Sequence, residues 1–236
     1  HNTYPVGKQG GIEIIQHGDR VATNGYINVD LPPGQSFPRP DAAERTVSSD
    51  NKEISARINV PDFDFSYTIR LWPENEAIHL AVDLDKPIPE EWKNRVTFDM
   101  LLYPVPYREK TFQLGETFGV FPYEALGPKV KRDDGEFIPA PMAKGSKLMI
   151  APEDPKYKME IEQLNGDMAL VDGRNGSHGG WFILQSQINT GVTKGAVEWI
   201  IKPNAIPGWI RDPMIGISQV GYHSEQVKQA IIELDS

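Results

Sequence analysis

The sequence predicts an all-β fold, a large antiparallel β-sandwich with little helix. Three observations predict this class. Apolar residues recur at every second position in several segments, which is the spacing of a strand with one buried face. Glycine (21) and proline (20) together make up about one residue in six, and they cluster between those segments as turn formers do. No segment of convincing length repeats its apolar residues at helical spacing.

Four alternating segments lie in the first half of the chain. In one of them, Phe65 and Tyr67 fall on one face while Asp64 and Ser66 fall on the other. Proline-containing turns separate these segments, so each is expected to be a strand with one apolar side. The expected strands are residues 54–60, 63–71, 78–84 and 96–102.

The second half of the chain contains one strong turn signal. Residues 159–164 and 167–171 flank Asn165-Gly166, a pair that favours the type I′ turn of a hairpin. Further strands are expected at 181–188 and 196–201, loops at 30–50 and 103–145, and single helical turns at 89–95 and 224–229. Many short antiparallel strands in a chain of this length indicate a sandwich.

Composition excludes several classes of function. With 24 basic and 33 acidic residues the formal net charge is −9, and no basic cluster offsets it, so nucleic acid is not an expected partner. No apolar run approaches the ~20 residues of a membrane helix, and residues 1–5 have neither the basic nor the apolar region expected of a signal peptide. The absence of cysteine excludes disulfides, thiolate chemistry and cysteine-ligated metals.

A boundary is expected near the C-terminus. Residues 202–209 close the last strand of the main body, and Arg211-Asp212-Pro213 form a short connector. From Ile215 a new unit begins, with a strand expected at 229–234. We therefore divide the chain into an N-terminal β-sandwich domain, 1–212, and a segment, 213–236, that either pairs with the sandwich or belongs to another domain.

This last segment resembles the opening of the immunoglobulin-like domain of family 9 glycoside hydrolases, the family of cellulases and related β-glucanases. The resemblance is carried by Gln219-Val220-Gly221-Tyr222-His223-Ser224-Glu225-Gln226-Val227-Lys228-Gln229-Ala230-Ile231-Ile232. Ser224 stands where the family usually has proline. The preceding body resembles an extra N-terminal β-domain of some bacterial members, in the strings Pro89-Glu90-Glu91-Trp92, Gly119-Val120-Phe121-Pro122, Ile150-Ala151-Pro152-Glu153-Asp154-Pro155 and Leu170-Val171-Asp172-Gly173-Arg174-Asn175.

The resemblance implies context rather than chemistry. It implies a secreted, periplasmic or cell-surface bacterial protein acting on plant or microbial polysaccharide. Its partners would be the immunoglobulin-like and catalytic domains of the same chain, with the catalytic (α/α)₆ barrel beyond Ser236. No active-site residue of the family can be placed on this sequence. Size and strand count also look like the supersandwich, galactose mutarotase-like domains that precede helical barrels in several glycoside hydrolases.

Residues that could carry chemistry have simpler explanations. Asp62 and Asp64, and likewise Glu153-Asp154, could supply the paired carboxylates of a glycosidase, but their polar neighbours indicate a solvated surface. The five histidines are scattered, without the short spacing of a metal site. The string 172–177 offers oxygens for calcium but lacks the EF-hand order. No catalytic residue, metal or cofactor is therefore assigned.

Aromatic residues in loops are the feature with most functional promise, because exposed rings stack on the apolar faces of sugars. The candidate carbohydrate-binding residues are Trp72, Trp92, Tyr107, Tyr123 and Trp209. The alternative for each is packing beneath a loop or, for Trp209, between domains. Trp181 and Trp199 lie within expected strands, so they are expected in the core instead.

Three functions remain open from the sequence. The first is a non-catalytic N-terminal domain that supports or docks the catalytic barrel of a secreted glycoside hydrolase. The second is a carbohydrate-binding module that uses the exposed loop aromatics. The third is an independent mutarotase-like or lyase-like enzyme, which would need converging His, Asp or Glu side chains.

Overall fold

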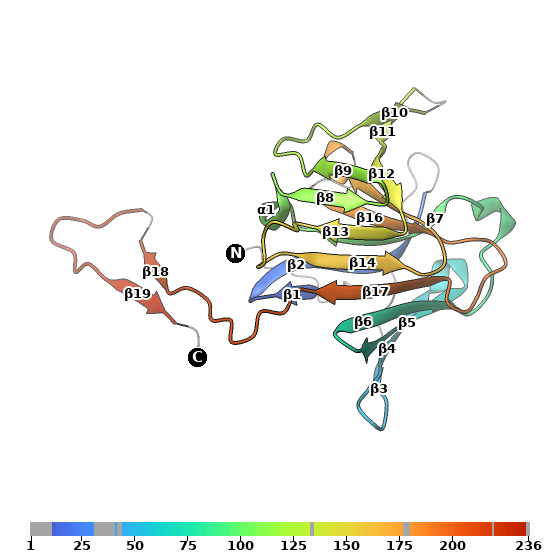
Figure 1. The fold of residues 1–236 in the computed structure, drawn as a ribbon, viewed down its shortest axis with the longest axis horizontal. Helices are drawn as coiled ribbons and strands as arrows, with labels where there is room; N and C mark the ends of the chain where they lie inside the picture. The colour runs from blue at the N-terminus through green and yellow to red at the C-terminus, as the bar shows by residue number, and fades with distance from the viewer. Residues whose placement is uncertain are drawn as a thin grey trace.

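The computed structural model describes residues 11–30, 41, 44–132, 135–176, 180–218 and 220–234. It is 51% strand and only 6% helix, and two antiparallel sheets pack face to face (Figure 1). The predicted all-β sandwich is therefore confirmed. Among the described residues no helix is long and apolar enough to cross a membrane.

Within the described residues, nine strands form the larger sheet. Their order is β3-β4-β5-β6-β17-β14-β13-β8-β9. The bounds are β3 Glu44–Val47, β4 Ile54–Val60, β5 Phe65–Glu74, β6 Ala77–Leu84, β8 Thr111–Leu114, β9 Thr117–Val120, β13 Lys147–Ile150, β14 Met159–Gln163 and β17 Val197–Pro203. Strands β4, β5 and β6 follow one another as a meander, whereas β17 returns from far along the chain to pair with β6.

Six described strands form the smaller sheet, in the order β1-β2-β7-β16-β15-β12. The bounds are β1 Ile14–Gln16, β2 Asp19–Val29, β7 Val96–Leu102, β12 Pro141–Gly145, β15 Met168–Asp172 and β16 Phe182–Gln187. The register of β2 against β7 shifts between Thr23 and Tyr26, where Asn24 has a φ of 58°. A β-bulge of this kind resets which side chains face outward.

Two short hairpins and four helical turns complete the described part of the fold. The hairpins are β10 Lys129–Lys131 with β11 Phe137–Pro139, and β18 Met214–Ile217 with β19 Ala230–Glu233. The helical turns are η1 Pro61–Phe63, η2 Glu90–Trp92, α1 Pro104–Tyr107 and η3 Gly173–Asn175. The helical turn expected at 89–95 is thus present as η2, whereas residues 224–229 are not helical.

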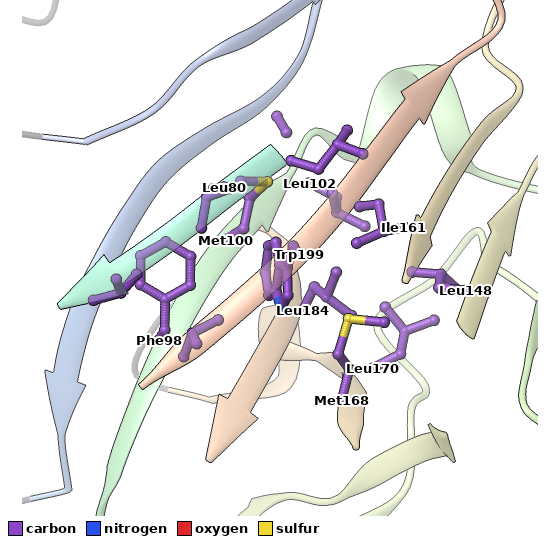
Figure 2. Packing of buried hydrophobic residues seen from close by; sticks show 14 of the residues in the cluster. Leu80, Phe98, Met100, Leu102, Leu148, Ile161, Met168, Leu170, Leu184 and Trp199 are labelled. Atoms are coloured by element: carbon purple, nitrogen blue, oxygen red, sulfur yellow. The ribbon is translucent and has the colours of Figure 1, made fainter. Parts of the chain in front are cut away.

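The hydrophobic core lies between the sheets, as Figure 2 shows for side chains from both of them. Trp199 of β17 is fully buried at its centre. Its Nε1–H donates to Ser186 Oγ (2.9 Å) and to Gln163 Oε1 (3.2 Å), while Ser186 Oγ also donates to Gln163. This network joins β14 and β17 of the larger sheet to β16 of the smaller sheet, so the indole N–H is satisfied inside the core.

The predicted hairpin at Asn165-Gly166 is wrong. Strand β14 pairs with β13 and β17 in the larger sheet, whereas β15 pairs with β12 and β16 in the smaller one. The Asn-Gly turn therefore carries the chain from one sheet to the other. Both strands turn apolar side chains to the same core from opposite sides, and alternation alone cannot distinguish this from a hairpin.

Most other strand predictions are confirmed, although several strands were not expected. Strands β4, β6, β7, β16 and β17 lie where alternation indicated them, and β5 begins at Phe65 because Phe63 ends the turn η1. Strands β1 and β2 and the short strands β8–β13 were missed, since register shifts interrupt the first two and glycine and proline are frequent among the others. Within the expected loop at 30–50, residues 44–47 form β3, while 31–40 and 42–43 lie outside the described residues.

Candidate functional site

Trp72 and Trp92 are held by neighbouring side chains. The ring of Trp72, on β5, stacks on His79 of β6 at 4.1 Å between ring centroids, and the Arg70 guanidinium lies 5.1 Å from its centroid. Trp92, in η2, meets the edge of Phe63 at 4.8 Å and packs against the core. Both rings are half-buried, so each is part of the protein's own packing.

The expectation of an available ring at Tyr107 is wrong, because this residue is fully buried. It lies at the end of α1, and its ring stacks on Phe121 at 5.6 Å. Burial raises the pKa of the Tyr107 phenol far above its ordinary value. The proline-initiated turn that made residues 104–107 look like a surface loop instead points this side chain into the core.

Tyr123 is the exposed member of the five, with 57% of its surface accessible. The Arg108 guanidinium lies 5.3 Å from its ring centroid. The other rings contact different partners, and the five residues lie on separate elements and loops. The structure therefore does not bring the predicted aromatics together as a sugar-stacking strip.

Trp209 lies in a cluster that attaches the segment after β17 to the turn between β1 and β2. We call His17, Lys156, Ile206 and Trp209 the connector anchor. His17 Nδ1 is 2.8 Å from the carbonyl oxygen of Lys156, and the Ile206 N–H donates to His17 Nε2 at 3.2 Å. These two bonds require a neutral imidazole that carries its proton on Nδ1. The His17 ring also packs on Trp209 at 5.1 Å.

Residues around the connector anchor reinforce the attachment. The Asn204 N–H donates to the Lys158 carbonyl (3.0 Å) and its Nδ2 to the Pro155 carbonyl (2.8 Å). Asp19 lies 2.7 Å from Lys156 Nζ and accepts the Tyr157 hydroxyl at 2.7 Å. Burial raises the pKa of Asp19, but the Lys156 and Tyr157 hydrogen bonds outweigh this and hold it below its ordinary value. The connector therefore leaves the sandwich from a fixed point.

Beyond this anchor, the β18–β19 hairpin projects away from the sandwich (Figure 1). The predicted strand at 229–234 is thus present as β19, and it pairs with β18 rather than with a sandwich strand. The hairpin exposes apolar side chains from neighbouring positions of its strands, so both of its faces carry them. These residues are Met214, Ile215, Ile217, Ile231 and Ile232. A two-stranded hairpin with two apolar exposed faces is marginal in water by itself.

A second candidate region is the outer face of the smaller sheet, where polar and aromatic side chains lie side by side. Asp99 of β7 is almost fully buried; it accepts Gln185 Nε2 at 3.2 Å and Asn28 Nδ2 at 3.2 Å. Burial first, and the Asp99 charge second, raise the pKa of Tyr26 to about 12. Tyr26 and Gln185 lie opposite Asp99 on the flanking strands. We call these four residues the outer-face row.

An aromatic pair and an apolar strip continue this face. Tyr103 and Trp181 meet edge to face at 4.6 Å, beside a small cluster of Leu101, Val171 and Ile183 that is separate from the main core. Trp181 was assigned to the core from the sequence, but it lies one position before β16 and on the opposite side from the core residue Phe182. Only the pairing of β7 with β16 brings it to Tyr103.

The candidate acidic residues are engaged in structural contacts. Asp64 pairs with Lys86 and Asp154 with Lys110, Glu153 accepts the N–H and hydroxyl of Thr111, and the side chain of Asp62 lies outside the described residues. Asp172, one of the residues whose oxygens could suit calcium, is fully buried and accepts a hydrogen bond from Arg174 Nε at 2.8 Å. Among the described residues no three His, Asp or Glu side chains gather as they would to hold a metal ion; His1 and His178 lie outside them.

No protein-family model and no curated protein matches this chain.

Proposed function

We propose that this chain is a non-catalytic β-sandwich domain that docks and supports neighbouring domains of a secreted glycoside hydrolase similar to family 9. The observation that supports it best is the β18–β19 hairpin, which leaves the sandwich from the connector anchor and exposes isoleucines on both faces. Burying one such side chain contributes about 1.5–3 kcal/mol. A domain that follows would gain this stabilisation by covering them.

Within this proposal the hairpin is the first part of an immunoglobulin-like domain, and the catalytic barrel follows it. The connector anchor then fixes the direction in which the sandwich presents its neighbours, since His17 and Asn204 hold the chain at residues 204–206. The polysaccharide would be of the β-glucan type. The sandwich itself contributes position and stability rather than chemistry.

The test compares residues 1–236 with the longer polypeptide that contains this segment. Amide hydrogen exchange at Ile215 and Ile231 is expected to be fast in the short chain and strongly slowed in the long one, because covered strands exchange slowly. Hydrolysis of β-glucan is expected from the long chain alone. Fast exchange at both residues in both chains would refute docking, and reproducible hydrolysis by residues 1–236 would favour the independent enzyme.

Carbohydrate binding is a second candidate, supported by the half-buried Tyr103–Trp181 pair on the same sheet face as the outer-face row, from which Leu101 and Ile183 separate it. Half-buried rings that share a face with amide and carboxyl groups are a combination that sugar sites use. Affinity electrophoresis in β-glucan gels would test it with Trp181→Ala, using Trp72→Ala as the control from the other sheet. Retardation that is lost only with Trp181→Ala supports this function, and equal mobility of all three proteins with and without glucan contradicts it.

A further inference from the structure

The two sheets of the sandwich have four edges among the described residues, formed by β3 and β9 in the larger sheet and β1 and β12 in the smaller one. An edge strand presents unpaired backbone N–H and C=O groups to its surroundings. Monomeric proteins protect such edges with charged residues, proline, β-bulges or very short strands. The four edges can therefore be compared for these devices.

Three of these edges, β3, β1 and β12, carry such protective features. Strand β3 contains Glu44 and Arg45. Strand β1 has three residues and an irregular register after Ile14. Strand β12 contains Pro141 and Lys144, and its register also shifts. Each of these edges is a poor template for another strand.

Strand β9 has four residues, as many as β3, but it carries none of the other protective features. Its sequence, Thr117-Phe118-Gly119-Val120, has no charge and no proline, and it pairs with β8 without a register shift. Phe118 is 75% exposed and Val120 54%. Apart from its ladder with β8, no described residue forms a backbone hydrogen bond with β9. Gly119 is required here, because a Cβ would lie 2.4 Å from the Phe112 ring that fills the inner side.

We propose that β9 is a self-association edge, at which a second copy of this chain adds its own β9 in antiparallel orientation and continues the larger sheet. The strand is self-complementary in that arrangement. With Gly119 opposite Gly119 of the second copy, each Phe118 lies opposite Val120 of the other copy. Aromatic and β-branched side chains form favourable cross-strand pairs, and a two-fold axis through the glycines satisfies both edges at once.

Size sets the expected affinity. A four-residue ladder with one aromatic and one β-branched side chain per copy is smaller than the ~800 Å² per partner of a stable complex. The dimer is therefore expected to be weak, with a dissociation constant of roughly 10 μM to 1 mM. No like charges oppose one another within the strand, so salt should act mainly by screening the net charge of −9 on each copy, and moderate salt should strengthen the dimer slightly.

Sedimentation equilibrium of residues 1–236 between about 10 μM and about 1 mM covers this range and tests the proposal. The weight-average mass is expected to rise from monomer toward dimer for the wild type and to remain monomeric for Phe118→Lys. Val47→Lys is the matched control. Val47 is 50% exposed on the protected edge β3, and its replacement by lysine adds the same charge as Phe118→Lys. Circular dichroism verifies folding of each variant.

A fourth protein, Ile231→Lys, separates this edge from the β18–β19 hairpin, whose exposed isoleucines are a different surface. Association that survives Ile231→Lys and Val47→Lys but not Phe118→Lys supports the proposal. A wild type that stays monomeric at about 1 mM, beyond the weakest dissociation constant expected for such an edge, overturns it. Association abolished by Ile231→Lys and unaffected by Phe118→Lys also overturns it.

Discussion

Arg174 holds a loop and a buried carboxylate together, which makes its replacement by alanine the most informative single change. Its Nε and Nη2 donate to the two oxygens of Asp172 at 2.8 and 2.9 Å. Its guanidinium also donates to the carbonyl oxygens of Pro122 (2.8 Å), Tyr123 (2.9 Å) and Glu124 (2.8 Å). The guanidinium also lies over the ring of Phe182, with Cζ 4.3 Å from the ring centroid.

The expected loss in the free energy of unfolding follows from the contacts that Asp172 keeps after Arg174→Ala. Asp172 is fully buried, and without the guanidinium it keeps the Gly127 N–H (3.2 Å) and the Arg174 main-chain N–H (3.2 Å) but no positive partner. Removing one member of a buried ion pair typically costs 3–5 kcal/mol, since the other charge remains buried. We therefore expect the free energy of unfolding to fall by about 3–5 kcal/mol, with additional local release of residues 122–127.

The assay is urea denaturation of wild type, Arg174→Ala, Asp172→Ala and the double variant. In the double variant no charge is left buried, so its loss of stability should be smaller than the sum of the two single losses by about 1–3 kcal/mol. Arg174→Lys should be intermediate, because an ammonium keeps the charge but not the two-pronged contact. A loss of less than about 1 kcal/mol in the free energy of unfolding for Arg174→Ala would refute the reasoning, because a buried carboxylate without its positive partner should destabilise the folded state by more than that.

Three further changes test other parts of the structure. Asp83→Asn should destabilise the folded protein at neutral pH. Burial raises the pKa of Asp83, but the Gly195 N–H, Arg70 and Lys194 outweigh the effect of burial and hold this pKa below its ordinary value. This contribution is present above the unfolded pKa and is lost as pH falls through the lower folded value, so the difference from wild type in urea titrations should shrink below about pH 4; a difference independent of pH contradicts this. Ser186→Ala should cost about 1–3 kcal/mol in thermal or urea unfolding, since it removes a buried hydrogen-bond partner of Trp199, and a change near zero would exclude the network as a source of stability. Trp209→Ala should accelerate hydrogen exchange at residues 204–206 while changing global stability by less than about 1 kcal/mol, and unchanged exchange would show that the ring does not hold the connector.

Alternation predicted the faces of strands well and their partners poorly. Residues 54–60, 78–84 and 96–102 form β4, β6 and β7 almost as expected, because a period of two is a local property of the chain. The Asn165-Gly166 turn shows the limit. Its flanking strands face the same core from opposite sheets, and nothing within those residues distinguishes that arrangement from a hairpin.

The environment of the candidate aromatics was even less accessible to prediction. Tyr107 and Trp92 share proline-rich surroundings in the sequence, yet one ring is fully buried and the other half-buried. Trp181 was assigned to the core and instead lies on the outer face with Tyr103. In each case the side chain's surroundings come from residues distant in sequence.

Local patterns in the chain were enough to predict the fold class and the apolar face of each regular strand, because side-chain alternation and turn chemistry act over only a few residues. The sheet that each strand joins, the place where the connector is anchored and the edge that lacks charge and proline all follow from contacts between distant residues. These depend on pairings such as β17 with β6 and on contacts such as His17 with Ile206, 189 residues away. Long-range contacts are selected by how well whole surfaces pack together, and no short pattern in the chain encodes that choice.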